Sequence, residues 1–220
     1  WINFWSITSE KSIKIRSNSC IKKFINIIFS MLNYIKVIEI LISLQAIFIS
    51  SMIPVFVPIQ DSNNFNQSLE IPITWQIPTI ILTSLIFGRK VVYIAFSIYL
   101  YLGLFLIPIF HQGGSLGYLL TPNFGYLIGI YPLIKIIGNL NTKNKIKTFD
   151  FIKSGILAIT AMHISGIIYS FIQLFYYNKL SSFLYNLSSY SLGKIGFHFL
   201  MLIPLYLLTK PINYIKYKLK

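Results

Sequence analysis

The stretch TSLIFGRKVVYIAF (Thr83–Phe96) joins two strongly apolar runs through the short basic turn Gly88-Arg89-Lys90. Glycine readily ends a helix, and Lys or Arg at the end of an apolar run is typical of the cytoplasmic side of a membrane. The stretch therefore predicts two membrane-spanning helices that are joined on the cytoplasmic side.

The same charge pattern extends along the rest of the chain. Basic residues cluster in residues 11–36, 89–90, 135–153 and 210–220. Of the 19 Lys and Arg residues, only Lys179 and Lys194 lie in or just beyond the alternate loops, which we place near residues 56–75, 109–124 and 176–190. Because short loops rich in Lys and Arg stay in the cytoplasm, the chain is predicted to cross the membrane six times, with both termini cytoplasmic.

Composition supports an all-α, polytopic membrane protein. Apolar residues make up 55% of the 220 residues, charged residues 11%, and the mean hydropathy is +0.69. A membrane-spanning helix needs about 20 residues, so six of them occupy most of the chain and leave no room for a second domain. The net charge of +14 is better explained by orientation at a membrane surface than by nucleic-acid binding.

The apolar runs set the expected boundaries. We expect a basic extension and amphipathic lead-in at 1–34, a six-helix domain at 35–209 and a basic cytoplasmic tail at 210–220. No signal peptide is expected at the beginning of the sequence. The expected location is the cytoplasmic membrane of a prokaryote, with an organelle inner membrane as the alternative. The six spans are expected near residues 37–55, 75–87, 91–107, 124–138, 151–171 and 191–208.

The residues needed for catalysis are scarce. The chain has five Asp and Glu residues and a single cysteine, Cys20. Gly193-Lys194 is followed by Ile195, which lacks the Mg²⁺-binding hydroxyl of a P-loop. We therefore expect no enzyme activity, no cofactor and no metal site.

Polar residues inside the apolar runs have two readings. Glu39 is interpreted as the partner of Lys36 at the inner surface rather than as part of a proton relay. His163 fits a hydrogen-bonded packing residue, and the alternative is a contact to a ligand. Ala46 and Ser50 form a small-x-x-x-small pair that would allow close helix approach.

A glycine-rich segment, Phe110–Gly129, is the densest functional signal. It reads FHQGGSLGYLLTPNFGYLIG, an outer loop that enters a helix. Glycines let the backbone approach a ligand closely and leave N–H donors accessible, and Tyr118 could cover a ring-shaped solute. An ordinary extracellular turn explains the composition equally well.

Residues 71–140 resemble the BioY family, the biotin-binding S component of energy-coupling-factor (ECF) vitamin importers. The matching motifs are IPITWQ (71–76), FGRK (87–90), YLYLGL (99–104) and the glycine-rich segment. The resemblance implies a membrane subunit that binds biotin with high affinity. It also implies a transmembrane coupling protein and ATPase subunits as partners.

The resemblance further implies that Gly113, Gly114 and Tyr118 contact the vitamin, with Asn123 as an additional contact and Gln76 supporting the pocket. The family's Gly-Asp-x-x-Lys motif is altered here, because Lys194 and Phe197 stand at the Asp and Lys positions. Lys194 could still meet a ligand carboxylate. The alternatives are a diverged S component for another small solute, or a membrane protein with a structural or assembly role.

Overall fold

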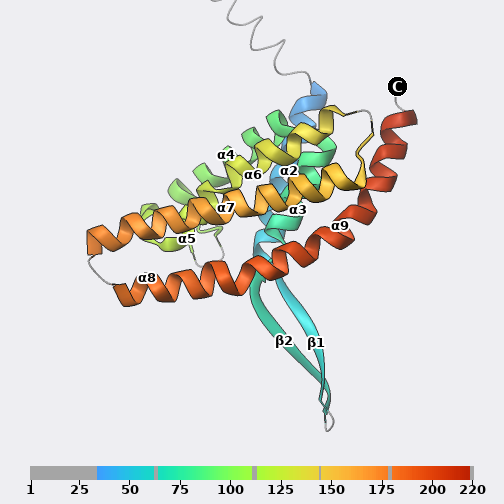
Figure 1. Cartoon of the computed structure of the whole chain (residues 1–220). Coiled ribbons are helices and arrows are strands. Elements are labelled where there is room, and N and C mark those ends of the chain that lie inside the picture. The colour runs from blue at the N-terminus through green and yellow to red at the C-terminus, as the bar shows by residue number, and fades with distance from the viewer. Residues whose placement is uncertain (1–33, 62–63, 111–112, 144, 178–179, 219–220) are drawn as a thin grey trace, which may run out of the picture. The chain divides into compact units, whose positions relative to one another are not determined.

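The computed structural model describes residues 34–61, 64–110, 113–143, 145–177 and 180–218, and these are mostly helical (Figure 1). The chain divides into two units, Trp1–Glu39 and Ile40–Lys220, and the packing described here belongs to the second. The expected extension at 1–34 lies outside the described residues, apart from Tyr34. The elements are α2 (Tyr34–Met52), β1 (Pro54–Asp61), β2 (Asn64–Thr74), α3 (Gln76–Phe87), α4 (Arg89–Phe105), η1 (Leu116–Leu120), α5 (Pro122–Ile128), α6 (Ile130–Gly138), η2 (Asn139–Thr142), α7 (Thr148–Tyr177), α8 (Leu180–Asn186), η3 (Leu187–Leu192) and α9 (Gly193–Lys218).

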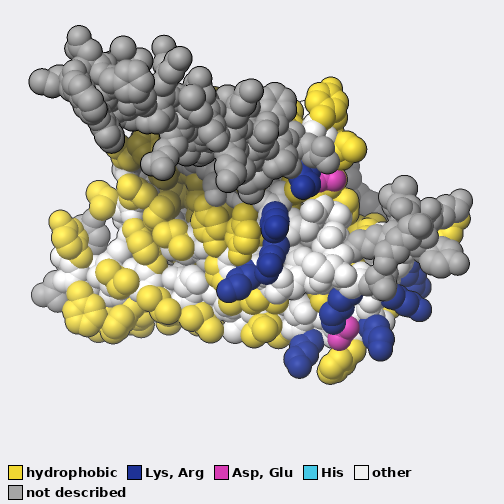
Figure 2. Space-filling view, turned by 90° about the horizontal axis from the view of Figure 1, so that it is seen from above, with side chains coloured by type: hydrophobic (Ala, Val, Ile, Leu, Met, Phe, Trp, Pro, Cys, Tyr) yellow, Lys and Arg dark blue, Asp and Glu magenta, His cyan; other side chains and the backbone are white. Residues whose placement is uncertain are grey.

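Three helical segments, Tyr34–Met52, Thr148–Tyr176 and Phe183–Tyr214, are long and apolar enough to cross a membrane. In lipid an α-helix satisfies its own backbone hydrogen bonds, which is why apolar runs of this length fold in this way. Many of their large apolar side chains face outward. Leu157, Ile168 and Phe175 of α7 are 56%, 55% and 76% exposed, as a lipid-facing surface requires. Figure 2 shows such side chains covering much of one face.

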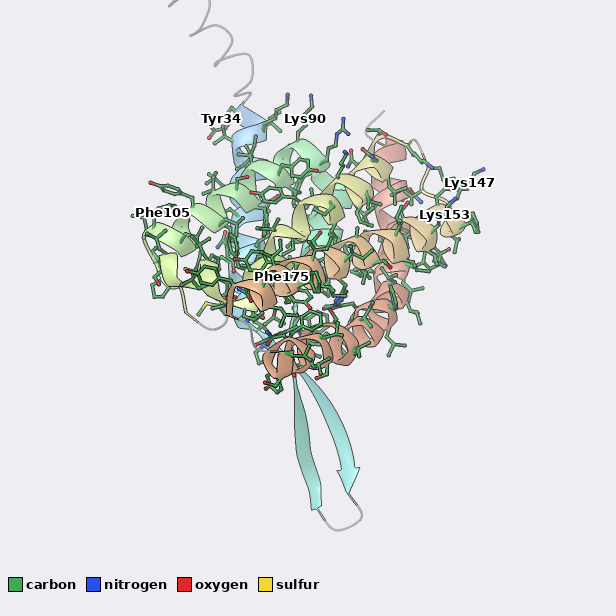
Figure 3. All side chains as sticks on the ribbon, turned by 60° about the vertical axis from the view of Figure 1, so that its left-hand side comes forward. Tyr34, Lys90, Phe105, Lys147, Lys153 and Phe175 are labelled. Atoms are coloured by element: carbon green, nitrogen blue, oxygen red, sulfur yellow. The ribbon has the colours of Figure 1, made fainter. Side chains whose placement is uncertain are left out.

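The turn between α3 and α4 forms as expected. Gly88 has a φ of 82°, a left-handed conformation that glycine adopts without strain, and its N–H donates to Ser84 O. Lys90 at this turn and Lys147 and Lys153 near the start of α7 lie in the half of Figure 3 opposite the β-hairpin. This clustering agrees with the charge pattern of the sequence.

The segment expected to be an outer loop at 56–75 forms an antiparallel hairpin, so the purely α-helical prediction is wrong here. In the hairpin, β1 pairs with β2 from Pro54↔Thr74 to Asp61↔Asn64. Its base is closed by a hydrogen bond of 3.2 Å from Trp75 N to Ile53 O. Val55, Val57 and Ile59 alternate in the sequence, and β-branched residues at a period of two favour a strand.

Two other boundaries differ from the expected ones. Much of the loop expected at 176–190 is helical, because α8 and the π-helical turn η3 lead directly into α9. Helix α9 continues to Lys218 instead of ending near residue 208. The expected fourth span is two short helices, α5 and α6, which meet at Gly129.

The core lies where α3, α4, α6 and α7 meet. Its fully buried side chains include Ile80 and Leu85 of α3, Phe96 of α4, Ile134 of α6 and Ile159 of α7. In the pair Ala46 and Ser50, Ser50 is buried and Ala46 is half-buried, and their role in close helix approach stays a prediction. A cavity lies beside this core, against the starts of α3 and α6 and the middle of α7.

Candidate functional site

A cavity of about 510 Å³ lies between the end of the hairpin, the α3 start, the η1–α5 segment, α7 and the α8–α9 region. Regions far apart in the sequence therefore form a single site. Its wall is mostly apolar, with a few polar groups. The lining residues are Ile73, Thr74, Gln76, Ile77, Tyr118, Asn123, Tyr126, Leu127, Ile130, Met162, His163, Tyr185, Ser189, Tyr190, Gly193, Lys194 and His198.

Four of the predicted site residues, Gln76, Tyr118, Asn123 and Lys194, line this cavity together. The side-chain Nε2 of Gln76 is buried and makes no hydrogen bond of ordinary geometry among the described residues, although the Tyr99 hydroxyl interacts with this side chain. Leaving a buried donor unpaired costs about 1–3 kcal/mol, so this atom is suited to an acceptor on a ligand. Direct contact of the four residues with a ligand stays a prediction.

Gly113 and Gly114 are not among the residues that line the cavity. The structure gives both glycines a role in the loop instead. Gly113 has a φ of 106° and donates its N–H to Phe110 O at 2.9 Å. A Cβ at Gly114 would lie 2.5 Å from Gly103 O and 2.6 Å from Pro108 Cα. Their predicted contact with a ligand stays a prediction, and their conformation supports the alternative reading of a structural turn.

Lys194 supplies a positive charge to the cavity wall. Its Nζ lies 5.0 Å from the centroid of the Tyr190 ring, which attracts a cation through its π electrons. None of the described side chains places a carboxylate within 4.0 Å of this ammonium. The charge is therefore available to an anionic group of a ligand.

A hydrogen-bonded row of four side chains forms another part of the wall. The Tyr126 hydroxyl lies 2.6 Å from Ser191 Oγ, and Ser191 Oγ lies 3.4 Å from His163 Nδ1. His163 Nε2 lies 3.1 Å from His198 Nδ1. Tyr126, His163 and His198 line the cavity, whereas Ser191 is buried behind it. The sequence signal for this row was the presence of two histidines within apolar runs, which are rare and often functional in membranes.

The row of Tyr126, Ser191, His163 and His198 is positioned by the close approach of α5 to the backbone of α7. Gly166 of α7 faces the ring of Tyr126, and an added Cβ there would lie 2.4 Å from the ring atoms. The Tyr169 hydroxyl donates to Leu119 O, which ties the η1 turn to α7. Small residues on α7 thus allow the α5 tyrosine to lie against this helix, near the α9 histidine.

Among the residues that the structure describes, no group of three His, Cys, Asp or Glu side chains is arranged to hold a metal ion. The arrangement consists of a mostly apolar wall, an ammonium group, a row of hydrogen-bonded polar side chains and a buried amide. Such a site can bind an organic solute with an anionic end and neutral polar groups.

Comparison with known proteins gives consistent matches. A sequence model of the BioY family matches residues 29–188. A protein described as the probable biotin transporter BioY of Lysinibacillus sphaericus is 30% identical over 105 residues, which cover 47% of this chain and 54% of that protein. The match thus covers about half the length of this relative.

Among solved structures, the crystal structure of the S-component for biotin from an ECF-type ABC transporter matches with a TM-score of 0.55 and 22% identity. The match covers 81% of this chain and 94% of the other. At this level of identity the likeness establishes a shared fold.

Proposed function

The chain belongs to the BioY family, and from this we propose that it is the integral membrane subunit that binds biotin for uptake. In this proposal the chain captures the vitamin with high affinity, and a separate ATP-hydrolysing module drives its delivery. It binds its solute and does not transform it chemically.

The observation that carries the proposal is the partly open cavity of about 510 Å³. Small-molecule sites are mostly apolar hollows of about 300–1,000 Å³ with a few placed polar groups. Ile77, Leu127, Ile130 and Met162 offer an apolar surface to the thioether ring and the aliphatic chain of biotin. Lys194 offers a charge partner for the carboxylate of the vitamin.

The proposed membrane arrangement is six crossings with both termini in the cytoplasm of a prokaryote. It is supported by the clustering of basic residues on one side of the expected spans and by the helical segments that overlap each of those spans. The proposed partners are an ECF transmembrane coupling protein and its ATPase subunits. The description of the structurally similar protein as a component of an ECF-type transporter supports this assignment.

Equilibrium binding of radiolabelled biotin to the full chain, purified in detergent, tests the proposal. Leu127 lines the cavity and is 7% exposed, whereas its neighbour Ile128 faces outward and is 42% exposed. We expect saturable binding by the unaltered chain, loss of binding in Leu127→Trp and unchanged binding in Ile128→Trp. Thermal melting of each variant establishes that it is folded, and Leu127→Phe provides a milder replacement. Absence of saturable binding by the unaltered chain would contradict the proposal.

A second candidate, an S component for a different small solute, is favoured by one observation. Lys194 occupies the position at which the family's motif carries Asp, so the polarity of this part of the wall is reversed. If biotin is the ligand, Lys194→Met should weaken its binding by about tenfold or more while leaving biotin methyl ester unaffected, since a charge-assisted hydrogen bond contributes about 1.5–3 kcal/mol. Lys210→Met, at an exposed position of the same helix, is the control. Tighter biotin binding in Lys194→Asp would favour the second candidate.

A further inference from the structure

The row Tyr126–Ser191–His163–His198 ends at an atom that has no partner within the described part of the chain. His198 Nδ1 faces His163 at 3.1 Å, and no hydrogen bond is formed by His198 Nε2. His198 lines the cavity although its side chain is only 6% exposed. Its second ring nitrogen is therefore the polar atom that this row can offer to a bound solute.

The chemistry of the row gives it two complete hydrogen-bond patterns. A neutral imidazole has one N–H donor and one acceptor nitrogen. If Tyr126 donates to Ser191, Ser191 donates to His163 Nδ1 and His163 Nε2–H donates to His198 Nδ1, then His198 Nε2 carries a hydrogen and is a donor. If every bond runs the other way, His198 Nε2 is an acceptor and the Tyr126 hydroxyl becomes free to donate.

In both patterns each internal position has one donor and one acceptor. A mixture at the histidine pair would place two hydrogens, or none, between His163 Nε2 and His198 Nδ1, whereas the Ser191 hydroxyl can accept from both of its neighbours. In a buried row such a mismatch is costly, because low local polarity makes an unpaired group expensive. The two imidazole rings are therefore expected to change direction together, with Ser191 accepting from His163 or donating to it.

We propose that His198 is a further ligand-recognition residue of the cavity, and that His163, Ser191 and Tyr126 are positioning residues that set whether its free nitrogen donates or accepts. This inference rests on the proposed function of the cavity as the biotin site. The matching ligand chemistry is a neutral group with both N–H donors and a C=O acceptor, such as a urea or amide. Lys194 lies one helical turn before His198, on the same face of α9, and remains the partner for an anionic group.

Two substitutions of His198 separate ligand recognition from a structural role. The amide of Asn can take the place of the Nδ1 that faces His163, whereas the longer Gln can place its amide where Nε2 faces the cavity. We expect His198→Gln to keep biotin affinity within about threefold and His198→Asn to lose about tenfold, the equivalent of one hydrogen bond. If His198 were only a packing partner of His163, the order of the two variants would be reversed.

A double-substitution cycle tests the positioning residues. Ser191→Ala interrupts the row and, as a single substitution, should weaken biotin binding several-fold. In a His198→Ala background it should cause no further loss, because the side chain that contacts biotin has already been removed. Ser165→Ala is the matched control, since Ser165 of α7 bonds Ala161 O at 2.9 Å and does not line the cavity. Its effect should be small in both backgrounds.

The outcomes of these experiments distinguish a failure of the proposed biotin-binding function from a failure of the role proposed for the row. Thermal melting first establishes that every variant is folded. If the unaltered chain fails to bind biotin, the proposed function is overturned together with this inference. If the unaltered chain binds, but His198→Asn binds as tightly or Ser191→Ala weakens binding equally in both backgrounds, the row has no role in recognition and only this inference is overturned.

Discussion

At Gly114 the backbone of the glycine-rich loop lies against two other backbone segments. A methyl group there would meet Gly103 O at 2.5 Å and Pro108 Cα at 2.6 Å, so the chain would have to shift. By contrast, a methyl group at Gly196 of α9 would meet no atom within 4 Å. Substitution by Ala is therefore expected to change the stability of the protein in opposite directions at the two glycines.

We expect Gly114→Ala to destabilise the protein by about 1–3 kcal/mol, the usual range for overpacking. Gly196→Ala should be neutral or stabilising by about 0.5–1 kcal/mol, because Ala loses less conformational entropy than Gly in a helix. Thermal melting in detergent measures both changes. Equal melting temperatures for the two variants would show that the loop tolerates a side chain and that its close packing is not required.

Individual site residues differed in how far they could be predicted. Gln76, Tyr118, Asn123 and Lys194 were identified by family motifs or by an unusual charge, and all four line one cavity. The pairing of His163 with His198 was not predicted, because the sequence does not reveal that α7 and α9 place these positions face to face. A histidine within an apolar run is compatible with either packing or binding until its neighbour is known.

At the scale of the elements, Asn141 holds the end of α3. The last carbonyl groups of a helix have no partner within it. The Asn141 Nδ2 donates to Leu85 O at 2.6 Å and to Ile86 O at 2.7 Å, which satisfies two of them. This links η2 to the basic turn that separates α3 from α4.

Asn141→Ala should therefore destabilise the protein by about 1–2 kcal/mol, because it leaves these carbonyls without a protein donor. Asn139→Ala, two residues earlier, is the comparison. Asn139 accepts a bond of 3.0 Å from the exposed Arg89 Nη1, and exposed pairs contribute little. Chemical unfolding in mild detergent measures the difference, and a larger effect at Asn139 would contradict this assignment.

The elements were predicted well where apolar runs are long and less well where they are short. The basic turn at Gly88 was identified from its glycine and its charges. The hairpin was missed because its polar residues read as a loop, and because its strands of 8 and 11 residues mix polar with apolar residues and contain proline. The helical content of residues 180–192 was missed because a polar segment was taken as a connection.

For the whole molecule, the distribution of charge predicts how the chain is oriented in the membrane. Lys145 lies in the basic connection between η2 and α7 and is exposed, whereas Leu116 lies in η1 and is 55% exposed. In a Cys20→Ser background, we expect Leu116→Cys in intact cells to react with a membrane-impermeant maleimide. Lys145→Cys should react only after the membrane is opened.

Leu116 is a better labelling position than the adjacent Ser115, whose φ of 119° is a strained conformation that the wild-type serine supports by accepting a bond from Gly117 N. Labelling of both cysteines from the same side would contradict the predicted orientation. The number of membrane crossings was inferred from the positions of the charges and the lengths of the apolar runs. This experiment tests whether successive loops lie on opposite sides of the membrane, on which that inference depends.

The π-helical turn Leu187–Leu192 sets the direction of the side chains at the start of α9. The Gly193 N–H bonds Ser188 O, five residues back, so the turn holds one residue more than an α-helical turn. One additional residue rotates the following side chains by about 100° around the helix axis. The side chains of α9 that line the cavity are Lys194 and His198, which lie four residues apart and so on one face of the helix. The turn therefore rotates Lys194 and His198 together and leaves their spacing unchanged.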